Sequence, residues 1–452
     1  MMKNKKMKQR YASYLLIFFL ICTSCGLRER IDGSDTEETE AEIKSSYESN
    51  ESSFPGQTAG LIEDPIFDTE EYLKEYDNNN YFSGAFKSIA ENERTVYYIN
   101  IFAGNRGRYL HYYDKESGIS DILCARPECM HQDEDCGGYV GSTQPGLFLY
   151  DGKLYWIGLV SDPTGKSHFL NALIRCDLDG RNRETVLLID REITLYDVPQ
   201  EYYLHRGYLY YTGSIHTVNA AGEAAEKISI KALSIEKGGK PVTVFEEYCY
   251  AAVVARPKLF FRGTKLYYVY GYGDAGGGEK NYTACCYDMR SEETETLFRG
   301  AFSEEWKPYL SEYSFWMESG TIYQIFWNGE EGNGEECSVK KLEDGKWTET
   351  YRQRKAFDIG CGYVISFAKE EAGAVGEGNS LVLTVRGLEG SLKYQGKLQA
   401  SMNGEYISIA VPGGNEEGLY ISIGEAAGSG GMQVHLYKAD IKNQTPPKMI
   451  IE

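Results

Sequence analysis

The stretch from Leu147 to Leu188 contains four short apolar-rich segments. It reads LFLYDGKLYWIGLV over Leu147–Val160 and, after a polar loop, NALIRCDLDGRNRETVLL over Asn171–Leu188. Asp151-Gly152 separates the first two segments and Asp179-Gly180 the last two, and glycine accepts the positive φ that tight hairpin turns require. The stretch therefore predicts one four-stranded antiparallel sheet. Because a lone sheet cannot bury two apolar faces, it must stack on other sheets.

Two landmarks of this stretch recur along the chain. The first is a turn followed by a tyrosine-rich strand, and the second is a strand, a turn and another strand, which appears seven times. The aligned tyrosines of the first landmark, Tyr97, Tyr155, Tyr210, Tyr267 and Tyr323, are 58, 55, 57 and 56 residues apart. From Tyr323 to Tyr420 is 97 residues, which is room for two shorter units, one of them with a degraded landmark at Asp358–Glu370.

This repeat predicts an all-β fold. A four-stranded blade needs about 40–50 residues, and radial closure of such sheets leaves only short, protected edges. We expect a β-propeller over residues 81–452, with seven four-stranded blades within a range of six to eight. A pair of smaller sandwich domains is the alternative.

The N-terminal residues 1–24 have the pattern of a signal peptide. A basic segment, which contains Lys3, Lys5, Lys6, Lys8 and Arg10, precedes an apolar run of ten residues at 12–21. That run is too short to span a bilayer and fits a signal sequence. Thr23 and Ser24, followed by Cys25, resemble the lipobox of bacterial lipoproteins, with Cys22 where leucine is usual. The resemblance implies that Cys25 carries a diacylglyceryl group and becomes the first residue; an ordinary secretory signal is the alternative.

The next two segments connect this anchor to the repeats. Residues 25–60 are acidic, rich in Ser and Thr and poor in apolar side chains, which predicts a disordered tether. Residues 61–80 are transitional. Each buried CH₂ contributes about 0.8 kcal/mol, so two acyl chains hold a protein at a membrane. We therefore expect the chain at the cell membrane, on the extracytoplasmic face and attached through its lipid only.

Charge limits the partners. Cleavage after residue 24 removes five of the 47 basic residues and none of the 67 acidic ones, which leaves a net charge of −25. That charge repels phosphate backbones, and no basic stripe is present, so we expect no nucleic-acid binding. An extracellular glycan, peptide or protein is the expected partner, and the chain itself is expected to be a monomer.

One loop concentrates reactive side chains. Cys124, Cys129, His131 and Cys136 lie within thirteen residues, in the sequence CARPECMHQDEDC. Three thiolates and an imidazole form a complete tetrahedral set for a structural Zn²⁺. A disulfide, which an extracytoplasmic location permits, and inert thiols are the alternatives.

The remaining cysteines do not form a framework, because nine cysteines besides Cys22 and Cys25 cannot all pair. We expect those outside the loop on strands, as small apolar side chains: Cys176, Cys249, Cys285, Cys286, Cys337 and Cys361. Cys285 and Cys286 should point to opposite faces of their sheet. The five tryptophans, Trp156, Trp306, Trp316, Trp327 and Trp347, are expected in the cores between blades, with sugar stacking as the alternative.

No catalytic motif is recognised. Asp177–Asn182 lacks the ligand series of a Ca²⁺ loop and predicts a turn. Gly165-Lys166-Ser167 has the wrong spacing for a phosphate loop. A glycosidase-like pair among the many carboxylates cannot be located from the sequence.

Two groups of proteins resemble the chain. Lys153-Leu-Tyr-Trp156 with Ile174–Asn182 is similar to a blade of the YWTD and TolB-like propellers, with Gly158 in place of their Asp. The lipobox, the acidic tether, the tyrosine-rich repeats and the loop C-x-x-P-x-C-x-H-x4-C resemble lipoproteins of anaerobic Gram-positive bacteria. The second group has no established activity, so the resemblance implies fold and location.

Together these features predict a lipid-anchored propeller that binds a partner without catalysis. A hydrolase that acts on glycans or peptides is the alternative function.

Overall fold

The computed structural model describes residues 88–99, 109–131, 135–141, 143–161, 169–189, 201–218, 224–249, 253–273, 280–301, 306–308, 315–328, 336–354, 356, 358–369, 380–399, 406–426 and 432–451. All of them belong to one compact unit, Ala59–Glu452. Every regular element in these ranges is a β-strand. Within them, no helix has the length and apolar character that crossing a bilayer demands.

The strands form seven antiparallel sheets, which we call blades 1 to 7 in chain order. Blade 1 contains β1 (Ile89–Glu91), β2 (Thr95–Ile99), β3 (Leu110–Asp114) and β4 (Ser120–Ile122). Blade 2 contains β5 (Thr143–Tyr150), β6 (Lys153–Ser161), β7 (Phe169–Asp177) and β8 (Glu184–Leu188). Blade 3 contains β9 (Tyr202–His205), β10 (Tyr208–Val218), β11 (Ala224–Ser234) and β12 (Gly238–Cys249). Blade 4 contains β13 (Val253–Arg262), β14 (Lys265–Gly273), β15 (Lys280–Asp288) and β16 (Glu293–Ala301).

The other three blades follow the same order. Blade 5 contains β17 (Trp306–Pro308), β18 (Phe315–Glu318), β19 (Thr321–Asn328), β20 (Cys337–Glu343) and β21 (Lys346–Gln353), with both β17 and β18 paired to β19. Blade 6 contains β22 (Asp358–Gly360), β23 (Tyr363–Lys369), β24 (Ser380–Gly387) and β25 (Leu392–Gln399). Blade 7 contains β26 (Tyr406–Asn415), β27 (Gly418–Ala426), β28 (Met432–Asp440) and β29 (Thr445–Ile451).

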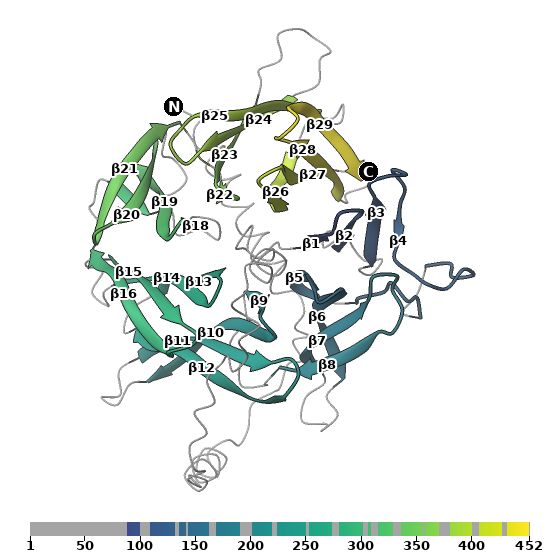
Figure 1. Cartoon of the computed structure of the whole chain (residues 1–452), viewed down its shortest axis with the longest axis horizontal. Helices are drawn as coiled ribbons and strands as arrows, with labels where there is room; N and C mark the ends of the chain where they lie inside the picture. The colour runs from purple at the N-terminus through teal and green to yellow at the C-terminus, as the bar shows by residue number, and fades with distance from the viewer. Residues whose placement is uncertain are drawn as a thin grey trace, which may run out of the picture. The chain divides into compact units, whose positions relative to one another are not determined.

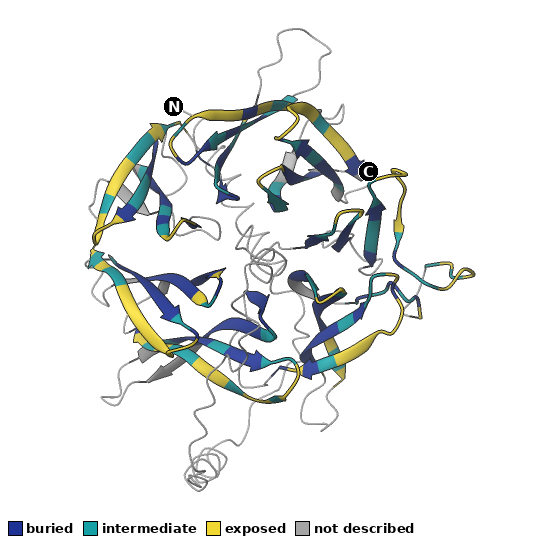
Figure 2. Ribbon diagram, in the orientation of Figure 1, coloured by how far each residue is buried: buried dark blue, intermediate teal, exposed yellow. Residues whose placement is uncertain are grey.

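The blades are arranged in a ring, so the predicted seven-bladed propeller is confirmed (Figure 1). In each blade the first strand, or β18 in blade 5, lies nearest the centre and the last strand lies at the rim. Buried residues gather on the inner strands and exposed ones on the rim strands (Figure 2). The described strands begin at Ile89; the predicted boundaries at residues 24, 60 and 80 lie outside the described residues.

The first landmark marks the second strand of each blade, or β19 in blade 5. Each aligned tyrosine lies two residues into that strand, and Ile365 takes the position in blade 6, where the landmark is degraded. Asp151 and Gly152 form the predicted two-residue turn, with φ of 47° and 65°. The second predicted turn is longer than Asp179-Gly180, because β7 ends at Asp177 and β8 begins at Glu184. Asn182 donates to Asp177 across it at 2.5 Å, which confirms a turn where a Ca²⁺ loop was considered.

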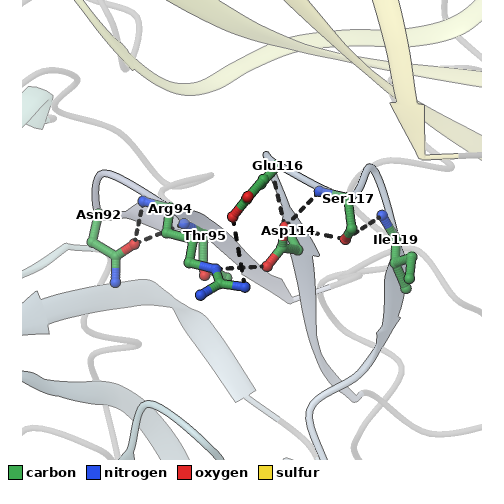
Figure 3. Close-up of polar contacts among 7 residues, drawn as sticks. All are labelled: Asn92, Arg94, Thr95, Asp114, Glu116, Ser117 and Ile119. Carbon is green, nitrogen blue, oxygen red and sulfur yellow. Dashed lines mark hydrogen bonds and ion pairs between the residues drawn. The ribbon is translucent and has the colours of Figure 1, made fainter.

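An aspartate recurs at the turn between the third and fourth strands. Asp114, Asp177, Asp288 and Asp440 each pair with the first residue of the second strand of their blade. Asp114 accepts the backbone N–H groups of Glu116 and Ser117 at 3.0 and 2.8 Å and the side chain of Arg94 at 3.0 Å (Figure 3). The Ser117 amide and the Arg94 guanidinium lower the pKa of Asp114 to about 2. The carboxylate therefore stays charged and holds the turn.

Neighbouring blades bury their facing surfaces against each other. The largest apolar cluster joins blades 4, 5 and 6 and includes Phe260, Ile325 and Val364. Trp156 and Trp316 are buried, and Trp327 and Trp347 pack against a core, as predicted. The side chain of Trp306 is outside the described residues.

Among the described strands, none is shared between blades 7 and 1, since β29 pairs within blade 7 and β1–β4 form blade 1. The apolar cluster at this junction is small: Ile89, Val96, Tyr98, Tyr113, Tyr420, Leu436 and Ile450. A polar contact lies beside it. The Glu91 carboxylate accepts the Tyr420 hydroxyl at 2.7 Å, the Lys115 ammonium at 2.6 Å and the Asn415 amide at 3.2 Å. Glu91 therefore joins the first blade to the last.

Replacing Glu91 with alanine should lower the free energy of unfolding by about 2 kcal/mol, because the buried Tyr420 hydroxyl loses its acceptor. Urea unfolding followed by tryptophan fluorescence measures the change. Glu417→Ala is the matched control: it breaks the Glu417–Lys442 pair, whose side chains are 59% and 61% exposed, and should cost under about 0.5 kcal/mol. Equal losses in the two variants would contradict a role of Glu91 in closure.

Candidate metal centre

The cysteine loop connects blade 1 to blade 2. We define the metal loop as residues 124–131 and 135–139, the described residues between Leu123 and Val140. It leaves the ring at the outer edge of blade 1 (Figure 1). Leu123 and Val140, which flank the loop, are buried in the apolar cluster between blades 1 and 2. The loop is therefore fixed at both ends.

The structure brings all four predicted ligands together. One ligand atom from each of Cys124, Cys129, His131 and Cys136 lies within 4.8 Å of the others. Nδ1 of His131 is 3.2 Å from Sγ of Cys136. Zn–S bonds of about 2.3 Å place the corners of a tetrahedral site roughly 3.8 Å apart, so the four atoms need only small shifts to bind one ion. The donor set suits zinc.

Backbone turns bring the four candidate ligands together. The Cys129 amide donates to the Arg126 carbonyl at 3.2 Å, and the Tyr139 amide to the Cys136 carbonyl at 3.0 Å, so both ends of the loop turn back. Gly138 is needed for the close approach, because a Cβ there would lie 2.6 Å from Cγ2 of Ile122. His131, with φ of 54°, adds a left-handed residue between the two turns.

Backbone hydrogen bonds to the sulfur atoms of Cys124 and Cys136 favour the thiolate form, which is the form that binds a cation. Burial alone would raise the pKa of Cys124, but the backbone N–H groups of Arg126 and Gly137 and the neighbouring thiols lower it to about 6. Burial raises the pKa of Cys136 to about 12, against one hydrogen bond from the Gly138 amide. Such N–H···S bonds orient metal-bound thiolates.

No disulfide forms in the described part of the chain. None of the nine cysteines there, including the three of the metal loop, is bonded to another cysteine. Thus the loop holds its sulfur atoms close without bonding any pair of them.

Cysteines outside the loop pack in cores between blades. Cys285 and Cys286 lie side by side on β15 and enter different clusters, one toward blade 3 and the other toward blade 5, as predicted. Cys176, Cys249 and Cys337 are buried on strands, also as predicted. The strand prediction for Cys361 is wrong. It occupies the turn between β22 and β23 with φ of 55°, where blade 2 has Asp151.

A buried polar cluster near the centre of the ring was not predicted. Lys258 of β13 forms an ion pair with Oε1 of Glu201, at the start of β9, and Oε2 of Glu201 accepts the Tyr203 hydroxyl at 2.8 Å. Both charged side chains are buried. One carboxylate oxygen of Glu201 binds Lys258 of blade 4 and the other binds Tyr203 of blade 3, so the cluster joins these two blades. A single Glu and a single Lys, 57 residues apart, carry no signal in the sequence.

Arg183 is a second residue that the sequence did not reveal. It lies in the turn between β7 and β8, its guanidinium donates to the Tyr139 carbonyl of the metal loop, and it lies 5.3 Å from the ring centroid of Trp156. This contact joins the metal loop to blade 2.

Other predicted positions lie outside the described residues. These are Cys25 with the signal peptide and tether, and Gly165-Lys166-Ser167.

Comparison with known proteins identifies no family for this chain. No family model and no curated protein sequence matches the chain. Among solved structures, it is similar to one of two prolyl endopeptidases (13% identity, TM-score 0.45, 86% of this chain and 52% of the other). It is also similar to a PL25 ulvan lyase (11%, 0.46, 82% and 99%) and to the β-propeller domain of the Trilobed protease from Pyrococcus furiosus (13%, 0.40, 68% and 82%). The chain spans about half the length of the first of these. At such identities and TM-scores, the similarity carries no inference about fold or activity.

In the reduced, metal-free protein, iodoacetamide should alkylate Cys124 faster than Cys136. The pKa of Cys124 is lowered to about 6 and that of Cys136 raised to about 12. The reactive thiolate of Cys124 should therefore form as the pH rises through 6, whereas Cys136 stays protonated up to neutral pH. Mass spectrometry of alkylated peptides between pH 5 and 9 measures both rates. A rate at Cys124 that rises only above pH 8 would contradict the hydrogen-bonded thiolate.

Proposed function

We propose that this chain is a lipid-anchored, extracytoplasmic binding protein whose propeller recognises a glycan, a peptide or a protein and catalyses no reaction. The observation that supports the proposal is the seven-bladed ring, whose loops can present a surface to a partner. The metal loop adds a closed ligand set. Among the described residues, it is the one group of His, Cys, Asp and Glu side chains close enough to hold a metal ion. Four protein ligands occupy all four coordination positions of a tetrahedral ion, whereas catalytic zinc keeps one position open for water or substrate.

The position of the loop supports the same conclusion. The metal loop leaves the outer edge of blade 1, away from the central ends of the innermost strands. Near the centre, the Glu201–Lys258 pair satisfies its own charges. The net charge of −25 favours a neutral or cationic partner.

The lipid anchor accounts for the N-terminal sequence. The basic segment, the short apolar run and Cys25 match a lipoprotein signal, and the acidic tether would separate the propeller from the membrane. Two acyl chains on Cys25 would retain the protein there.

Cys25→Ala should move the chain from the membrane fraction to the soluble fraction of expressing cells, because it removes the lipidated thiol. Cys22→Ala, which changes a neighbouring thiol, should leave the chain in the membrane fraction. Immunoblots of the two fractions, with mass spectrometry of the mature N-terminus, give the result. Membrane retention of Cys25→Ala, or an N-terminus other than a diacylated cysteine, would refute the anchor.

The soluble Cys25→Ala chain also tests binding. Glycan arrays, peptide arrays and pull-downs from cell-surface extracts should reveal a retained partner, and the same panels should show no products by mass spectrometry. Turnover of a glycan or peptide would favour the hydrolase function instead.

We propose zinc as the metal of the loop, with a structural role. The reduced protein, purified without chelator, should contain about one equivalent of zinc by elemental analysis. Cys129→Ser should lose the metal, and Cys249→Ser, which changes a buried thiol of blade 3, should keep it. A metal-free wild-type protein whose thiol count reveals a disulfide would exclude zinc.

A further inference from the structure

Blade 1 is built from short strands. Two of its strands, β1 and β4, have three residues each, and β2 and β3 have five. On its blade 7 side, the described strands include none that the two blades share, and the described part of the apolar cluster has seven residues. The contacts between blade 1 and blade 2 are therefore important for keeping blade 1 in place in the ring.

The metal loop begins and ends inside that junction. Leu123 and Val140 are 6% and 4% exposed, within one cluster that also contains Trp156 of blade 2. Gly180, in the turn between β7 and β8, lies against the first of these anchors: a Cβ at Gly180 would be 2.9 Å from the Leu123 carbonyl oxygen.

The second half of the loop contacts both blades directly. The Leu110 amide of β3 donates to the Gly138 carbonyl at 2.8 Å, which fixes this half to blade 1. One residue later, the Tyr139 carbonyl accepts the guanidinium of Arg183 from blade 2. Cys136 lies three residues before Tyr139, so a metal bound by Cys136 fixes the backbone that both blades hold.

We infer that the metal centre is a staple between blades 1 and 2, with Arg183 as the residue that couples the bound metal to blade 2. The inference rests on the proposed zinc binding and deepens it. All four ligands lie between Cys124 and Cys136, so the loop binds the ion without Arg183. Binding then orders Gly138 and Tyr139, and through them β3 on one side and the β7–β8 turn on the other.

Hydrogen–deuterium exchange of the mature chain, with and without one equivalent of zinc, tests the staple. Zinc should slow amide exchange about tenfold both in β3 and β4 and in β7 and β8. Exchange in β15 of blade 4, which does not touch the loop, should be unchanged. Elemental analysis of the same samples counts the bound metal.

Arg183→Gln separates binding from coupling. The variant should still bind one equivalent of zinc, but zinc should no longer slow exchange in β7 and β8. Because coupling is reciprocal, its zinc affinity should fall about tenfold in competition with a chromogenic chelator. Arg175→Gln is the matched control, since Arg175 of β7 pairs with Glu184 at 2.6 Å within blade 2; its coupling and its affinity should match the wild type.

The outcomes are distinct. One equivalent of zinc with slower exchange in the metal loop alone would overturn the staple and leave zinc binding intact. Wild-type affinity and coupling in Arg183→Gln would overturn the role of Arg183. Absence of bound zinc in every sample would overturn both the staple and the proposed metal.

Discussion

The burial of sheet faces between neighbouring blades is the interaction on which the rest of this structure depends. Each four-stranded sheet has two apolar faces, and only a ring gives every face a partner. The hydrophobic effect is not directional, so it favours stacking without deciding where the stack ends. Closure has to be specified by other contacts, and at the junction of blades 7 and 1 the Glu91 carboxylate provides them. Burial and the negative charge of Glu91 both raise the pKa of Tyr420, so its hydroxyl remains a donor.

Polar contacts inside the ring also specify how neighbouring blades meet at other junctions. Glu201 lies four residues before the end of β9, and Lys258 lies four residues before the end of β13, so the two occupy equivalent positions in adjacent blades. A buried ion pair is a weak source of stability, because desolvation of both charges offsets their attraction. It does oppose slippage of one blade along the next, since a shift would leave a buried charge alone. A hydrogen bond between uncharged groups joins blades 4 and 5 in a similar way: the Tyr282 hydroxyl of blade 4 donates to Gln324 of blade 5.

The fold could be predicted from the sequence because its signals are local and repeated. The tyrosine spacing and the Asp151-Gly152 turn indicate strand length and hairpin geometry within a few residues. Because the pattern occurs seven times, blade 6 could be identified although its first landmark is degraded. The four candidate ligands of the metal loop could be selected for the same reason, since they lie within thirteen residues, and the structure brings them together. Contacts between distant positions were not predictable: Glu91 meets Tyr420 across 329 residues, and Arg183 reaches Tyr139 across 44. Cys361 was misplaced because its turn lacks the usual polar residue, and its thiol is instead buried there.

Each blade is built from one uninterrupted segment of the chain, as the strand order within every sheet shows. In a ring closed by a blade that combines strands from the first and last repeats, one sheet would be encoded by two distant parts of the gene. Here, duplication or loss of about 55 codons adds or removes a whole sheet, and the number of blades can change in evolution without splitting any of them. The same contiguity makes the boundaries between blades natural sites for circular permutation, at which new termini would interrupt no hydrogen-bonded ladder.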